Sequence, residues 1–157
     1  MSTDNDLDSL YEEIVLDHYR NPRSTRLLDA PAVDVETNNP FCGDEIRLQL
    51  ATDERGRVAI VSVSGRGCAI SQSSGSLLTG LVTGKSAQEL LDTVDVVRRL
   101  LKGGQVSEAE MARLGDLAAL AGVRRYPVRI KCALLAWSAL EEAAEKLRKP
   151  RPGQVLT

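Results

Sequence analysis

Aromatic residues are scarce in this sequence, and an excess of positive charge is absent. Phe, Trp and Tyr make up 3% of the 157 residues, with one Trp and one Phe. The interior must therefore be built from aliphatic side chains, which suits packed helices. A formal net charge of −2 gives no basic surface for nucleic acid or anionic membranes, so we expect neither as a partner. The basic tail at 146–157 is expected to be a solvated helix end, where cations complement the helix dipole.

Targeting and membrane signals are also missing. No run of residues approaches membrane-spanning length, and the acidic residues 1–14 do not resemble a secretory signal. Three cysteines, an odd number, argue against a disulfide framework and for reduced thiols. We therefore expect a cytoplasmic protein, and its length and 43% hydrophobic content fit one domain over residues 1–157.

Hydrophobic periodicity predicts an α+β fold, with an N-terminal helix, a small three-stranded antiparallel sheet and then helices packed on one face. Apolar residues at three- and four-residue spacing predict the first helix over 7–19. Alternating patterns predict strands, and helical spacing returns after Cys68. The strands are predicted at 32–36, 46–50 and 58–63, with a turn over 38–44, and the later helices at 69–83, 86–102, 107–121 and after Pro127.

Two capping-box patterns mark helix starts in the second half, Ser86 with Glu89 and Ser107 with Glu110. The second pattern lies within residues 103–122, a loop and helix of roughly twenty residues, longer than the usual connection between packed elements. The helix at 107–121 either packs on the rest of the protein as a lid or binds a partner. Its wide apolar face favours packing.

Three cysteines and one aspartate are the candidate metal ligands. Cys42 and Asp44 flank a glycine in the predicted turn, Cys68 follows the third strand, and Cys132 opens the last helix. Antiparallel pairing can bring Cys42 and Cys68 to one end of the sheet. Three thiolates and a carboxylate would then form a tetrahedral set acceptable to zinc. From spacing alone, an alternative stays open in which the cysteines are small core residues, although the polar turn around Cys42 is a poor place to bury an inert side chain.

Neighbouring cations and the histidine complete the set of candidates. Arg129 and Lys131 lie close to Cys132, and both cations and helix N-termini lower thiol pKa values. His18 is the only histidine and lies near the end of the first predicted helix. We favour a capping or packing role for it over metal ligation.

Four segments resemble the IscU and SufU family of iron–sulfur cluster assembly proteins, in the order in which that family carries them. They are LYEEIVLDHYRNPR, NNPFCGDEI, GRGCAISQSS and PVRIKCALLAW. Two departures separate the chain from IscU-type scaffolds. Lys131 replaces the histidine that precedes the third cysteine in those scaffolds, and residues 103–122 are inserted. In both respects the sequence is similar to the SufU branch.

The resemblance implies a zinc-dependent sulfurtransferase. Cys42, Asp44, Cys68 and Cys132 match the zinc ligands of that branch, and Cys42 matches the cysteine that accepts persulfide sulfur from a SufS-type cysteine desulfurase. It also implies that a donor from the desulfurase replaces Cys42 on zinc, and that the freed thiolate attacks the persulfide. The sulfur would then pass to a downstream Suf cluster-assembly scaffold. Arg129 matches an arginine near the zinc site and would steer the anionic sulfur species.

Two other functions remain as alternatives at this stage. The chain could instead be a scaffold that binds an iron–sulfur cluster through the same cysteines. Lys131 argues against that function, because a protonated lysine is a poor metal ligand. A structural zinc module that only docks partners would keep the metal without the chemistry.

Overall fold

The order of elements in the computed structural model, which describes residues 3–40 and 43–148, confirms the α+β class. One helix comes first, three strands follow, and the rest of the described chain is helical. The first part consists of α1 (Thr3–Arg20), β1 (Val33–Asn39), β2 (Asp44–Thr52) and β3 (Val58–Arg66). The second part consists of α2 (Ala69–Val82), α3 (Ala87–Leu101), α4 (Glu108–Leu114), the 3-10 segment η1 (Gly115–Arg125) and α5 (Pro127–Arg148).

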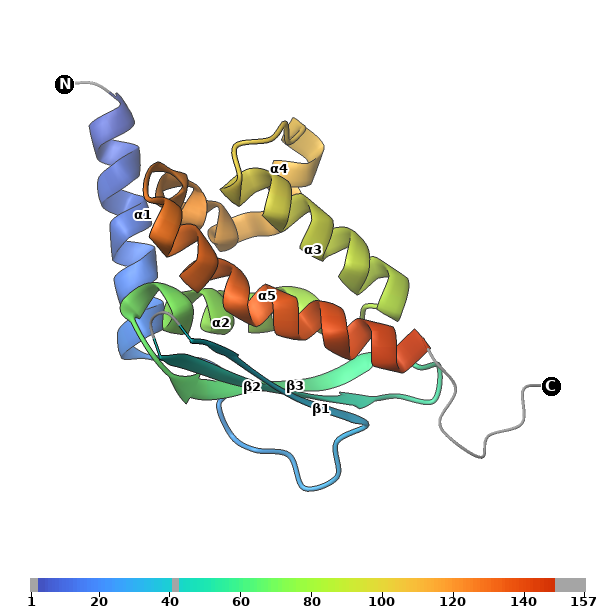
Figure 1. Ribbon diagram of the computed structural model, residues 1–157. Helices are drawn as coiled ribbons and strands as arrows, with labels where there is room; N and C mark the ends of the chain where they lie inside the picture. Colours follow the sequence, from blue (N-terminus) through green and yellow to red (C-terminus); the bar gives the residue numbers. More distant parts are fainter. Residues whose placement is uncertain (1–2, 41–42, 149–157) are drawn as a thin grey trace.

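The strands form an antiparallel sheet in the order β1-β2-β3, and helices cover one of its faces, as the sequence predicts. Helices α2 and α5 lie on this face and α3 packs against α5, whereas the segment between α1 and β1 passes along the other face (Figure 1). Helix α1 runs beside α2 at one end of the sheet. The sheet therefore has a helical side and a loop side.

Side-chain alternation along β2 explains which face is covered. Ile46, Leu48 and Leu50 point toward the helices and are at most 3% exposed. Leu48 pairs with Val35 on β1 and with Val63 on β3, so the three strands present one continuous apolar row. Asp44 occupies the first inward position of the same strand, which places a carboxylate at the end of the core.

Strands β1 and β2 are longer than predicted, and the turn between them is shorter than the predicted turn over 38–44. Strand β1 continues to Asn39, and both asparagines join the ladder, with Asn38 opposite Glu45 and Asn39 opposite Asp44. The prediction stopped at 36 because asparagine is rare in strands. Backbone pairing to β2 outweighs that preference here.

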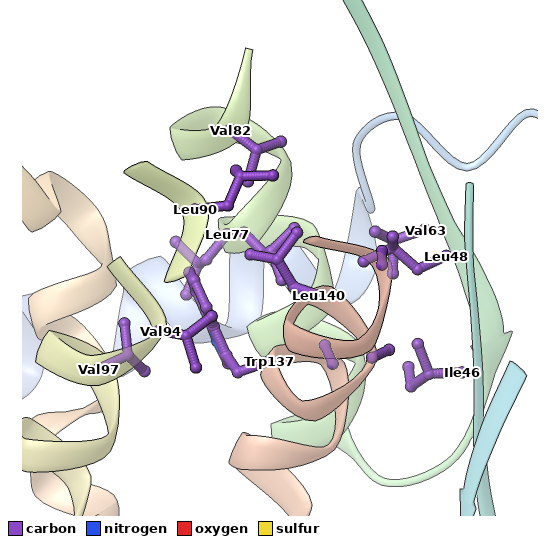
Figure 2. Packing of buried hydrophobic residues seen from close by; sticks show 14 of the residues in the cluster. Ile46, Leu48, Val63, Leu77, Val82, Leu90, Val94, Val97, Trp137 and Leu140 are labelled. Atoms are coloured by element: carbon purple, nitrogen blue, oxygen red, sulfur yellow. The ribbon is translucent and has the colours of Figure 1, made fainter. Parts of the chain in front are cut away.

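A single tryptophan lies at the centre of the helical layer. Trp137 on α5 has no exposed surface and belongs to the same apolar cluster as Val94 on α3 and Leu77 on α2 (Figure 2). The scarcity of aromatic residues is compatible with a closed interior because aliphatic side chains fill the space around this ring. An ion pair between Arg98 and Glu141 adds a polar link between α3 and α5.

Both predicted capping boxes are confirmed. The hydroxyl of Ser86 accepts the backbone N–H of Glu89, and the Glu89 carboxylate accepts the N–H of Ser86. Ser107 and Glu110 make the same reciprocal pair at the start of α4. These bonds satisfy backbone donors that would otherwise have no partner in the helix.

The prediction of one helix over 107–121 is wrong in its second half. Helix α4 ends at Leu114, and Gly115 has a φ of +54°, which breaks the α-helix. The chain continues as η1, whose Leu117 and Leu120 are at most 1% exposed. The insertion therefore packs on the core through this segment, as its apolar face indicates.

Within the part of the chain that the structure describes, no helix has both the length and the apolar character needed to cross a membrane.

Candidate metal site

Three of the four predicted ligands come together at the end of the sheet that α2 and α5 cover. One ligand atom from each of Asp44, Cys68 and Cys132 lies within 4.8 Å of the other two. Asp44 is 3% exposed and Cys132 is 2% exposed, whereas Cys68 is half-buried. The group is thus enclosed by protein on most sides and open at Cys68.

Each ligand is positioned by a different element. Asp44 is the first residue of β2, Cys68 lies between β3 and α2, and Cys132 lies in α5, five residues after Pro127. Cys132 was predicted to open this helix, and it lies instead at the start of the second turn. The group therefore forms only when α5 is in place on the sheet.

Helix α2 begins at Cys68 in a way that directs this residue toward Asp44. Cys68 is the N-cap residue, and its Sγ accepts the backbone N–H of Ser71 at 3.5 Å. Its own backbone N–H donates to Asp44 Oδ1 at 3.1 Å, and its thiol lies 3.5 Å from Asp44 Oδ2. A carboxylate beside a helix N-terminus is favoured by the partial positive charge there.

Gly67 is required at this corner for a steric reason. A Cβ added to it would lie 2.5 Å from Asp44 Oδ1 and 2.7 Å from Ser71 Oγ. The φ of Gly67 is +157°, a conformation that residues with a side chain seldom adopt. Sequence reasoning missed this role, although the glycine directly before a predicted helix cap was a usable signal.

The residues present fit a bound metal ion. Two sulfur atoms and one carboxylate oxygen are donors that zinc accepts, and together they would supply three of the four ligands of a tetrahedral site. The group could therefore hold a metal ion. The donor set favours a soft or borderline ion over magnesium or calcium, which take oxygen ligands.

Cys42, the fourth predicted ligand, lies outside the described residues. It precedes Asp44 by two positions in the sequence. Gly43, between them, has a φ of +72°, a left-handed conformation that glycine adopts at little cost. Ligation by Cys42 stays a prediction.

The two basic residues near the start of α5 line different cavities. Arg129 is exposed on the first turn and borders a groove of about 660 Å³ between α1, η1 and the starts of α2 and α5. Val15, Ile70 and Val123 form part of its apolar wall. Lys131 borders a second cavity of about 470 Å³, between the end of β1 and helices α3 and α5.

His18 is bonded to α2 and does not belong to this group of three ligands. Its Nδ1 lies 2.7 Å from Ser76 Oγ, which also accepts the backbone N–H of Arg23 at 2.9 Å. Partial burial, with the Arg23 charge, holds the pKa of the imidazole below its usual value. These contacts agree with the predicted packing role.

Comparison with known proteins places this geometry in a family. The model of the NifU-like N terminal domain matches residues 10–133, which include Asp44, Cys68 and Cys132. The chain is 39% identical over 146 residues to the zinc-dependent sulfurtransferase SufU of Bacillus subtilis (strain 168), covering 93% of this chain and 97% of that protein. It is 40% identical over 140 residues to the iron–sulfur cluster assembly scaffold protein IscU of Streptococcus pyogenes serotype M1, covering 89% of this chain and 86% of the relative.

Solved structures agree with the sequence relatives. The crystal structure of a putative iron–sulfur cluster assembly scaffold protein for the SUF system from Fervidobacterium islandicum AW-1 is similar with a TM-score of 0.78 and 30% identity. That similarity covers 87% of this chain and 97% of the other. The sheet-and-helix arrangement and the sequence therefore point the same way, and the chain belongs to the NifU-like N-terminal domain family, which includes SufU and IscU proteins.

Proposed function

We propose that this chain is a zinc-dependent sulfurtransferase of iron–sulfur cluster assembly, which accepts sulfur from a SufS-type cysteine desulfurase and passes it to a downstream Suf scaffold. The observation that carries the proposal is the group formed by Asp44, Cys68 and Cys132, whose ligand atoms lie within 4.8 Å of one another beside an exposed Lys131. The similarity to SufU of Bacillus subtilis supports it. The reaction would take place in the cytoplasm, where thiols remain reduced.

Asp44, Cys68 and Cys132 would hold the zinc ion together with Cys42. When bound, zinc would keep the cysteine sulfurs deprotonated at neutral pH. The two buried ligands, Asp44 and Cys132, would keep the site ordered, and the half-buried Cys68 marks the side from which a partner can approach.

Cys42 would be the sulfur acceptor. Its thiolate attacks the terminal sulfur of the desulfurase persulfide, a new S–S bond forms at Cys42, and the S–S bond on the desulfurase breaks. The desulfurase cysteine leaves as a thiolate with the bonding electron pair, so no external oxidant is consumed. Arg129, on the rim of the groove, would attract the anionic persulfide.

A cluster scaffold is the second candidate function, and the similarity to IscU of Streptococcus pyogenes favours it. The same three residues would then hold iron and sulfide. Lys131 weighs against this function, because a lysine ammonium has no lone pair to offer a metal while it is protonated.

The test is sulfide release by a SufS-type desulfurase with L-cysteine and a reductant, with and without the zinc-loaded protein. We expect the wild-type protein to accelerate release, and Cys42→Ala to remain folded but to abolish the acceleration. Arg129→Ala should reduce it, whereas the matched change Arg125→Ala, also on the groove, should not. When the reductant is left out, mass spectrometry of the wild-type protein should show the gain of one sulfur atom.

Two outcomes would contradict the proposal. Full acceleration by Cys42→Ala would remove the assigned acceptor. A brown, iron-bearing protein purified without oxygen that leaves the desulfurase rate unchanged would establish the scaffold function instead.

A further inference from the structure

Helix α2 buries an unusual number of hydroxyl groups. Ser71, Ser73 and Ser74 have no exposed surface, and Ser76 and Thr79 are at most 7% exposed. A buried hydroxyl without a partner destabilises a protein, and serine in a helix interior is not favoured by propensity. Each of these hydroxyls is therefore expected to have a hydrogen-bond partner inside the protein.

Most of these hydroxyls bond within α2 or toward α1. Ser71 and Thr79 donate to carbonyls of their own helix, those of Cys68 and Ser76. Ser73 donates to the Val15 carbonyl of α1 at 2.7 Å. The first two bonds are local to α2, and the third holds α1 against it.

Ser74 makes a different contact, since it joins α2 to α5. Its hydroxyl donates to the carbonyl of Ala133 at 2.6 Å and accepts the indole N–H of Trp137 at 3.0 Å. Ser74, Ala133 and Trp137 have no exposed surface, so water cannot replace either bond. Both capacities of the hydroxyl are used, as donor and as acceptor.

We propose that Ser74 is a positioning residue of the metal site, which sets the separation of Cys68 and Cys132 by bonding α2 to the carbonyl of Ala133, the residue that follows Cys132. The proposal rests on the metal site proposed above and not on sulfur transfer.

The bond between Ser74 and Ala133 acts on the two cysteines through helices α2 and α5. Cys68 caps the same helix that carries Ser74, six residues earlier, so it lies roughly 9 Å away along the helix axis. Ala133 is covalently bonded to Cys132. A change in the bond between Ser74 and Ala133 therefore moves one cysteine relative to the other.

Close packing against the sheet prevents α2 from shifting to compensate. A Cβ added to Gly75, the next residue, would lie 2.9 Å from Val63 Cγ1 of β3 and 3.8 Å from the Ala136 Cβ of α5. Helix α2 thus packs closely against both the sheet and α5 at Gly75. Loss of the Ser74 hydroxyl would leave the buried indole N–H without its partner, and the spacing between α2 and α5 would change.

The experiment compares Ser74→Ala with Ser73→Ala. Both variants remove a fully buried hydroxyl that donates to a carbonyl of another helix, and Ser74→Ala also leaves the Trp137 N–H without a partner, so it should lose more fold stability. The affinity for Zn²⁺ is measured by competition with a chelator, and the thiolate geometry by the absorption spectrum of bound Co²⁺. We expect Ser74→Ala to weaken Zn²⁺ binding by about tenfold or more and to alter the Co²⁺ spectrum, because groups that orient ligands have effects of this size. Ser73→Ala should leave both unchanged.

Equal losses of affinity in the two variants, or wild-type affinity in Ser74→Ala, would overturn the proposal. The single indole N–H keeps it testable if Ser74→Ala does not fold. In the wild-type protein its one NMR resonance should shift when Zn²⁺ binds, because coupling between the two sites is reciprocal. An unmoved resonance would also overturn it. Failure of the proposed transfer function would appear in a different measurement, as unchanged sulfide release with the wild-type protein.

Discussion

Replacing Gly67 by alanine should damage the metal site although none of the ligand residues is replaced. The added Cβ would lie 2.5 Å from Asp44 Oδ1 and 2.6 Å from its Cγ. Ordinary contacts lie near 3.5 Å, so the carboxylate must retreat by roughly 1 Å. That movement breaks the bond that the Cys68 N–H makes to Oδ1 at 3.1 Å.

The magnitude follows from burial and from the backbone. A 3% exposed carboxylate loses a donor, and alanine must also adopt the φ of +157°. Together these effects should lower the free energy of unfolding by about 2 to 4 kcal/mol. The affinity for Zn²⁺ should also fall, because Asp44 and Cys68 move apart.

Urea unfolding of the metal-free protein and chelator competition for Zn²⁺ measure the two effects. Gly80→Ala is the matched control. Gly80 lies within helix α2 but on its exposed side, and a Cβ added there would have no atom within 4 Å. It should stabilise the fold by about 0.5 to 1 kcal/mol. Wild-type stability and wild-type Zn²⁺ affinity in Gly67→Ala would refute the steric reasoning.

Two further predictions concern pH. Hydrogen bonds from Arg99 and from the Ser107 backbone hold the pKa of Glu110 at about 2. The contribution of Glu110 to folding stability is therefore complete above pH 4.5 and is lost as the pH falls toward 2. Thermal melting should show that Glu110→Gln loses less stability in acid than the wild type, and equal losses would contradict this. Burial lowers the pKa of His18, so the unfolded chain takes up a proton first and stability should fall as the pH drops below about 6.5. His18→Gln should flatten that dependence in metal-free protein, and a wild-type chain that becomes more stable over this range would contradict it.

The fold was predictable wherever one side-chain period dominates. Alternation gave the three strands, and the serine–glutamate pairs located the starts of α3 and α4. The break at Gly115 was not predictable, because apolar residues on both sides continue the same helical spacing and only the backbone conformation separates α4 from η1. Tertiary packing of Leu117 and Leu120 outweighs local helix propensity there.

The candidate site was predictable in its residues but not in its supports. Cys68, Cys132 and Asp44 could be chosen because thiols and a carboxylate at element ends suit a metal. Gly67 had a local signal, its place directly before the helix cap, that the prediction did not use. The bond between Ser74 and Ala133 has none, since it joins residues 59 positions apart. Such contacts depend on how α2 and α5 cross, which periodicity does not specify.

The position of Cys132 in α5 has a consequence for synthesis of the protein. Asp44 and Cys68 are joined by the β2–β3 pairing and by their own hydrogen bonds, so this half of the site can form from the first part of the chain. The third ligand arrives only with α5, whose packing requires Trp137 and Leu140 to reach the core. A ribosome-bound chain that ends before this helix could not hold a metal ion with all three ligands. Binding of the ion by all three residues would therefore require that the last helix has packed on the sheet. Because Cys132 lies in this last helix, an incompletely synthesised chain would not bind the ion through the full set.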